Sequence, residues 1–154
     1  MNVDVTDEQP LPVDTAGLRH LAELVLTAEG LPADTEVSVV FVPDEVIAAY
    51  NRRFMEREGP TDVLAFPLER LRPGEVPERA PGAPPLVLGD VFIAPGHVAV
   101  QAERLGADVE TEMALMVVHG LLHLLGYDHV DDEDAELMER RERELLAEVG
   151  MVRR

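Results

Sequence analysis

An apolar segment that ends in three histidines constrains this chain more than any other feature of its sequence. The run M-A-L-M-V-V is followed directly by H-G-L-L-H-L-L-G-Y-D-H, which begins at His119. Apolar side chains occur almost all round this stretch, so a buried helix is predicted over residues 109–125, with Asp108 as its N-terminal cap. His123 follows His119 by four residues, and both imidazoles therefore lie on one face of that helix.

The third histidine, His129, can join the first two. Gly126 is a typical helix stop, and the chain can turn back there to bring His129 to the same point. Three neutral imidazoles leave the fourth position of a tetrahedral metal ion open for water, which is the arrangement of a catalytic zinc site and not of a closed structural one. The sequence therefore predicts one Zn²⁺ per chain on His119, His123 and His129, although three imidazoles also suit copper and nickel.

Two other interpretations of the histidines are open. Two surface histidines followed by a turn histidine would bind nothing, but an apolar helix that buries an imidazole must give it polar partners. The spacing also equals that of metzincin proteases, H-E-x-x-H-x-x-G-x-x-H. The general-base Glu of that motif is Gly120 here, and glycine cannot accept a proton. The sequence thus favours a zincin-like metal helix but disfavours a metalloprotease of that kind.

Nearby polar residues are candidates to support the three histidines. Glu112 lies seven residues before the first histidine on roughly the same helix face, and Asp128 directly precedes the third. Either carboxylate can orient an imidazole. Asp128 is equally consistent with a turn residue that bonds its own backbone. We expect His20 and His97 to be ordinary residues outside the site.

The remaining periodicity predicts an α+β fold. Alternation and β-branched residues indicate four short strands, at Val3–Val5, Glu36–Val42, Val63–Phe66 and Leu88–Ala94. Helical spacing and capping residues indicate four helices besides the histidine helix, beginning near Asp14, Pro43, Pro95 and residue 132. Because strands and helices do not alternate strictly, we expect one domain over residues 1–154, with a small mixed sheet of about four strands packed by about five helices.

Residues 69–86 form a proline-rich segment that holds five of the 12 prolines. This composition predicts a mobile loop that is long for a compact domain. A linker between two domains is the alternative, but neither flank has the length for a core of its own. Arg70, Arg72 and Arg79 make the loop a candidate basic patch, the alternative being a solvated loop whose charges serve solubility.

The charge of the chain limits its partners. It carries 13 basic and 31 acidic residues, a formal net charge of -18, which disfavours a broad phosphate-tracking surface but not a small basic patch. The absence of cysteine excludes disulfides and thiolate metal sites. The N-terminus M-N-V-D-V-T-D-E-Q-P lacks the features of a secretory signal, and no apolar run approaches the roughly 20 residues of a membrane helix. We therefore expect a cytoplasmic protein with no membrane partner.

The histidine block resembles the signature of the YbeY family of bacterial endoribonucleases and rRNA maturation factors. Asn51 followed by P-T-D-V-L-A-F-P, and then L-G-D-V-F-I-A-P, resemble two further blocks of that family in the same order, over roughly residues 36–130. The resemblance implies zinc on the three histidines, cleavage of single-stranded RNA, maturation of the 3′ end of small-subunit rRNA, and ribosome quality control. The partners that it implies are the small ribosomal subunit and the GTPase Era.

Two positions depart from the family pattern. Many members have Arg directly after the aromatic residue of the Asn-x-x-aromatic run, where this chain has Met55, and the usual Ser of the next block is Ala65. Methionine cannot clamp a phosphate with a bidentate fork as arginine does. Arg52, Arg53 and Arg57 lie close in sequence as alternatives. No catalytic residue is assigned from the sequence.

Three functions remain open at this point. The first is a metal-dependent endoribonuclease, in which the metal polarises a phosphate oxygen or activates a water. The second is a ribosome-assembly factor whose zinc mainly holds the fold, which Met55 and the negative charge favour. The third is a hydrolase of another substrate such as a peptide, which Gly120 disfavours.

Overall fold

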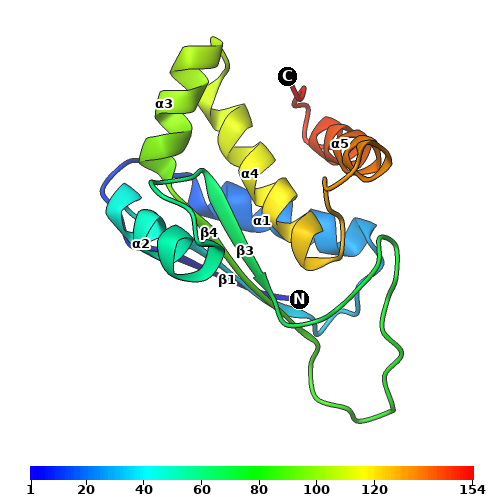
Figure 1. Cartoon of the computed structure of the whole chain (residues 1–154). Coiled ribbons are helices and arrows are strands. Elements are labelled where there is room, and N and C mark those ends of the chain that lie inside the picture. Colours follow the sequence, from blue (N-terminus) through cyan, green and yellow to red (C-terminus); the bar gives the residue numbers. More distant parts are fainter.

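Four strands form one mixed sheet in the order β1-β2-β4-β3, as a computed structural model of residues 1–154 shows (Figure 1). The strands are β1 (Asn2–Asp7), β2 (Glu36–Phe41), β3 (Val63–Pro67) and β4 (Val87–Ile93). The first, second and fourth run parallel, and β3 pairs antiparallel to β4 at one edge. The predicted α+β fold with a small mixed sheet is confirmed.

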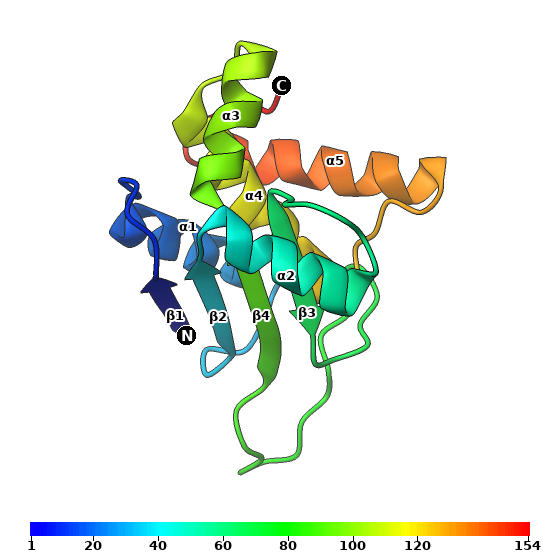
Figure 2. The same cartoon turned by 60° about the vertical axis from the view of Figure 1, so that its left-hand side comes forward.

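Five helices pack on the sheet or on one another. They are α1 (Thr15–Ala28), α2 (Asp44–Met55), α3 (Pro95–Leu105), α4 (Val109–Leu124) and α5 (Asp132–Ala147). Figure 2 shows α2 on one face of the sheet, with α1 and α4 on the other. The alternation along β2 matches this arrangement, because Val37 and Val39 enter the main core while Val40 packs in the smaller core on the side of α2. None of the helices has the length and apolar character that crossing a membrane requires.

Helix α4 is the central element of the main core. Its N-terminal cap is Asp108, as predicted, whose carboxylate accepts a hydrogen bond from the backbone N–H of Thr111 at 3.1 Å. Eleven of its 16 residues are buried, so the helix is enclosed almost all round. It contacts α1, α3 and α5 as well as β3 and β4. The position of the histidines is therefore set by the best-packed helix of the molecule.

Gly120 allows α4 to lie close to the sheet. A Cβ atom at this position would be 2.5 Å from Cγ1 of Val91 and 3.2 Å from Cγ2 of Val63. Val91 is completely buried and has no space to move into. The position at which a metzincin protease has its general-base Glu thus has no room for a side chain.

The proline-rich segment lies between β3 and β4 and contains neither helix nor strand. Arg79 ties it to the body of the protein through two hydrogen bonds to the Asp34 carboxylate, at 2.7 and 2.9 Å. The same guanidinium also donates to the carbonyls of Ala83 and Pro84. Arg79 is therefore engaged within the protein and does not belong to a free basic patch. The mobility of residues 69–86 stays a prediction.

Substitution of Gly120 tests the close packing of α4. Alanine raises helix propensity by about 1 kcal/mol relative to glycine. Overpacking of a buried site costs about 1–3 kcal/mol, and the overlap with immobile Val91 places Gly120→Ala at the upper end. We expect a net loss in the free energy of unfolding, measured by urea denaturation. The control Val100→Ala, at an exposed position of α3, should change it by less than about 0.5 kcal/mol. A Gly120→Ala protein as stable as wild type would contradict the packing described.

The Arg79–Asp34 pair makes the protection of the loop dependent on pH. The hydrogen bond from Arg79 holds the pKa of Asp34 below its ordinary value of 3.8. The pair is therefore fully formed above that ordinary pKa and is lost as the pH falls through the lowered one. Hydrogen exchange should show protection of residues 79–84 decreasing over that acidic range, and Arg79→Ala should remove it at all pH values. Arg72→Ala, which removes no ion pair, is the control. Equal protection in all three proteins would show that the pair does not hold the loop.

Candidate metal centre

The three histidines converge at the C-terminal end of α4. His119 and His123 lie on the last two turns of that helix, and His129 lies in the turn that follows. One nitrogen from each ring lies within 4.8 Å of the other two, and the ring centroids are 4.6, 5.1 and 5.5 Å apart. All three line a pocket of about 930 Å³. The predicted convergence is confirmed, and the cluster could hold a metal ion.

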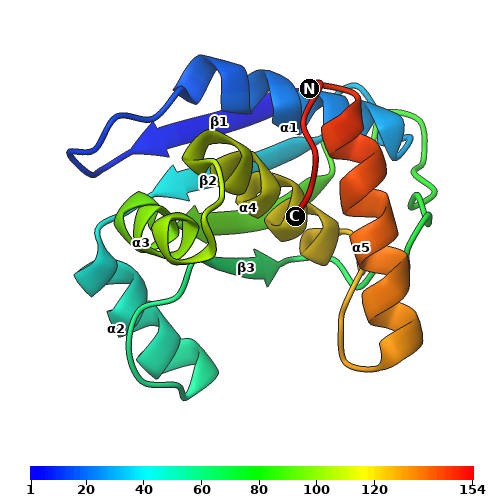
Figure 3. The same cartoon turned by 90° about the horizontal axis from the view of Figure 1, so that it is seen from above.

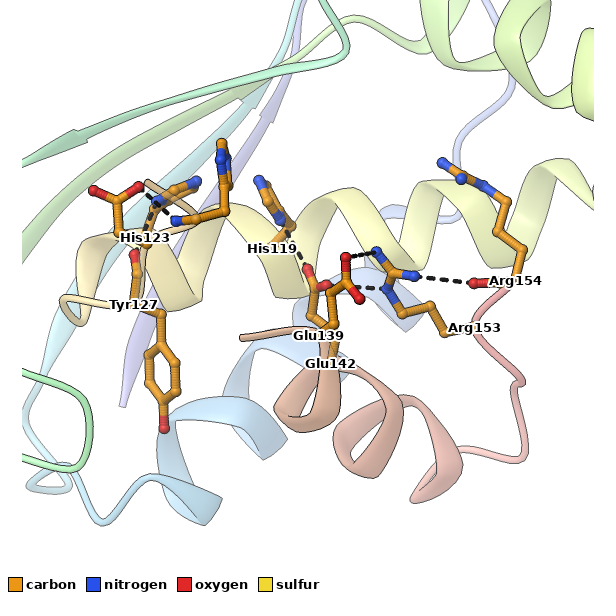
Figure 4. A network of polar contacts seen from close by, with 9 residues as sticks. His119, His123, Tyr127, Glu139, Glu142, Arg153 and Arg154 are labelled. Atoms are coloured by element: carbon orange, nitrogen blue, oxygen red, sulfur yellow. Dashed lines mark hydrogen bonds and ion pairs between the residues drawn. The ribbon is translucent and has the colours of Figure 1, made fainter. Parts of the chain in front are cut away.

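A buried carboxylate determines which nitrogen of His119 carries the proton. The Nδ1 atom lies 2.8 Å from Oε2 of Glu142, a residue of α5 that is 1% exposed (Figure 4). Because an ionised carboxylate only accepts hydrogen bonds, Nδ1 of His119 donates. In the neutral ring Nε2 then keeps its lone pair, which is what a metal ligand requires.

The backbone has the same effect on His123. Its Nδ1 donates to the carbonyl oxygen of Tyr127 at 2.9 Å, so its Nε2 also keeps a lone pair. The turn that places this carbonyl begins at Gly126, whose φ of +98° lies in the left-handed region. A Cβ atom there would be 2.1 Å from the carbonyl oxygen of Leu71. Gly126 therefore serves both the turn and the close approach of the loop after β3.

The side chain of Tyr127 holds the turn that follows α4. The hydroxyl of Tyr127 donates to Glu29 at 3.0 Å, and Arg141 of α5 donates to the other oxygen of that carboxylate. Burial, followed by the neighbouring charge of Glu29, raises the pKa of Tyr127 to about 12. The phenol stays protonated and hydrogen-bonded throughout the physiological range.

Electrostatics favours the neutral form of His123. Burial lowers the pKa of His123, and the adjacent His119 and His129 lower it further. Neutral imidazoles are the form that ligates a metal. Three converging imidazoles, two of them with Nε2 freed by defined partners, are a donor set that fits Zn²⁺.

The two carboxylates expected to orient an imidazole do not do so. Glu112 is buried but contacts no histidine, and accepts a hydrogen bond from Arg154 at 2.8 Å. Asp128 accepts from the backbone N–H of His129 at 2.8 Å, which is the turn-residue alternative. Sequence reasoning missed Glu142. The sequence feature that could have revealed it is its position four residues after Met138, on the buried face of α5. A carboxylate among apolar residues requires a polar partner.

Two unpaired arginines line the pocket beside the histidines. Met55 forms part of the wall, and of the three arginines near it only Arg57 does so as well. Arg53 instead stacks over the ring of Phe54, with its Cζ 5.2 Å from the centroid. Arg70 is the member of the expected loop patch that reaches the pocket. Neither Arg57 nor Arg70 forms an ion pair within the protein.

The pocket is less acidic than the protein as a whole. Its walls hold four arginines and four carboxylates, whereas the whole chain has a net charge of -18. Asp62 is one of those carboxylates, and its burial raises its pKa while the nearby His97 lowers it. His97 lies 3.4 Å from Asp62 and outside the metal cluster, and His20 is exposed on α1, as expected for both.

Comparison with known proteins decides the family. The family model described as "Endoribonuclease YbeY" matches residues 4–150. The chain belongs to the YbeY family of endoribonucleases.

Relatives and one solved structure agree with this assignment. A YbeY protein of Thermobifida fusca is 43% identical over 149 residues, covering 96% of this chain and 93% of the relative. One of Beutenbergia cavernae is 40% identical over 147 residues, covering 95% and 96%. Both are named endoribonucleases. The fold also matches the solution structure of a Thermotoga maritima protein with a TM-score of 0.63 and 26% identity, covering 96% of this chain and 91% of the other.

Proposed function

We propose that this YbeY-family chain is a zinc-dependent, single-strand-specific endoribonuclease with His119, His123 and His129 as the ligands of one Zn²⁺ per chain. The observation that carries the proposal is the convergence of three imidazoles in one pocket, two of them with Nε2 available. Within the cytoplasm its role would be maturation of the 3′ end of small-subunit rRNA and ribosome quality control. The small ribosomal subunit and the GTPase Era would be its partners. These roles and partners rest on the family resemblance.

The residues of the pocket have two different roles in this proposal, metal binding and phosphate binding. A bound zinc ion supplies a Lewis acid that polarises a phosphate oxygen or lowers the pKa of a water. As neutral ligands, the three imidazoles would add no negative charge to that ion. Arg57 and Arg70 supply the unpaired guanidinium groups that bind backbone phosphates, in place of the arginine absent at Met55.

The negative charge of the chain makes a delivery partner part of this function. A protein with a net charge of -18 repels RNA at low salt, whereas the pocket walls hold equal numbers of arginines and carboxylates. RNA that is already held by a ribosomal subunit approaches at high effective concentration, which offsets the repulsion.

The second candidate is a ribosome-assembly factor with a mainly structural zinc, which Met55 favours. A structural zinc site is closed by four protein ligands, whereas this cluster has three and opens into a pocket. A peptidase of the metzincin kind is disfavoured by Gly120, where no general base has room.

Metal removal and reconstitution test the nuclease directly. We expect the stripped protein to leave a short single-stranded RNA intact and one equivalent of zinc to restore cleavage, followed on a gel with metal content measured on the same sample. His119→Ala should lose both zinc and cleavage, whereas His20→Ala, at an exposed position of α1, should retain both. Stoichiometric zinc without cleavage, in the presence of small ribosomal subunits as well, would overturn the nuclease in favour of the assembly factor.

Substitution of the two pocket arginines tests phosphate binding. A hydrogen bond to a charged group is worth about 1.5–3 kcal/mol, and exposure reduces that value. We therefore expect Arg57→Ala and Arg70→Ala each to raise the KM for RNA roughly 3- to 10-fold. The zinc content should be unchanged. Arg52→Ala, exposed on α2 and outside the pocket, is the matched control. If all three variants cleave with the wild-type KM, these arginines do not contact the substrate.

A further inference from the structure

Glu142 is the most deeply buried carboxylate of the chain, at 1% exposed, and both of its oxygens have partners. Oε2 accepts from Nδ1 of His119 at 2.8 Å, and Oε1 accepts from Nε of Arg153 at 3.0 Å. A carboxylate at this depth is costly unless it is paired and hydrogen-bonded. The two contacts satisfy that requirement, and they join the C-terminal segment to the histidine cluster.

We propose that Glu142 is a positioning residue of the metal centre and that Arg153 holds it in place. The chain of contacts Arg153–Glu142–His119 fixes the His119 ring with its proton on Nδ1 and its Nε2 toward the other imidazoles. This inference rests on the proposed function, because the advantage of that orientation is the binding of a metal ion. It extends the centre beyond its three histidines to a helix and a terminal segment far away in sequence.

Arg153 removes the rotational freedom of the carboxylate. With one oxygen held by the guanidinium, Glu142 can turn neither its plane nor its χ angles away from His119 without breaking a charged hydrogen bond. Arg153 is itself held, since its guanidinium also donates to the backbone oxygen of Arg154 at 2.9 Å.

The last two residues bridge the two helices that carry this network. Arg154 donates to Glu112 of α4 at 2.8 Å, while Arg153 binds Glu142 of α5. Figure 3 shows the C-terminal segment returning from the end of α5 toward α4, and Figure 4 shows Arg153 beside Glu142. The segment therefore contacts α5 at Glu142 and the metal-binding helix at Glu112, about two turns before His119.

Glu142→Gln separates orientation from packing, because it keeps the shape of the side chain. Arg153 only donates, so it attracts the amide oxygen of Gln and leaves the amide N–H₂ facing Nδ1 of His119. That nitrogen must then accept, which moves the ring proton to Nε2 and blocks the metal-binding atom. Loss of such an outer contact typically costs about 10–100-fold in metal affinity.

The experiment measures zinc affinity by chelator competition and the His119 tautomer by ¹⁵N NMR of the metal-free protein. For Glu142→Gln we expect zinc affinity to fall about 10–100-fold and the Nδ1–H signal of His119 to be replaced by that of Nε2–H. Glu139→Gln is the matched control, since it removes a charge beside the same Arg153 one turn away without touching His119. Glu139→Gln should keep the wild-type tautomer and affinity.

Arg153→Met keeps the inference testable if Glu142→Gln does not fold. Its side chain is 17% exposed, so the substitution leaves no large cavity. We expect a smaller loss of zinc affinity, and partial recovery in Arg153→Lys. The inference would be overturned if the folded Glu142→Gln protein kept the wild-type zinc affinity and His119 tautomer. If only Arg153→Met folds, the same result in that variant would overturn it. If wild type itself binds no zinc, the proposed function fails, and a wild-type His119 tautomer other than Nδ1–H would overturn the positioning role independently.

Discussion

The close packing of α4 against the sheet is the constraint on which the rest of the structure depends. Gly120 lets the helix approach Val91, and 11 of the 16 helix residues are buried against the surrounding elements. The two helical histidines are thereby held at a fixed height above the sheet, and the left-handed Gly126 returns the chain to add the third. The same close contact leaves no room for a side chain at position 120, so the packing of the core excludes a general base there.

Helix α5 supports both helical imidazoles, through two consecutive residues. Glu142 contacts His119 directly, whereas Arg141 acts through Glu29 and Tyr127 on the turn whose carbonyl accepts from His123. Both routes lead to the same tautomer, with Nε2 free on each ring. The support comes from polar groups that are individually well paired, which is the condition under which buried charges do not destabilise a fold.

Much of this architecture could be predicted from local sequence signals, because those signals act within one element. The apolar character of α4, the Asp108 cap and the glycine stop gave its bounds to within a residue, and i,i+4 spacing alone brought two histidines together. The partner of His119 could not be found in this way, since Glu142 comes from 23 residues later and its contact depends on how α5 packs. Glu112 was the plausible local partner of His119, because it lies seven positions earlier on the same helix face. In the structure it accepts a hydrogen bond from Arg154 instead. The tie between Arg79 and Asp34, 45 residues apart, is nonlocal for the same reason.

The most direct test of the central claim is a crystal structure of the zinc-loaded protein with anomalous scattering recorded at the zinc edge. We predict one anomalous peak per chain, at about 2.0–2.1 Å from Nε2 of His119, His123 and His129. In the same structure Nδ1 of His119 should still donate a hydrogen bond to Glu142, and Nδ1 of His123 should still donate one to the Tyr127 carbonyl. A peak coordinated through either Nδ1 atom, or zinc bound elsewhere with this cluster vacant, would contradict this prediction.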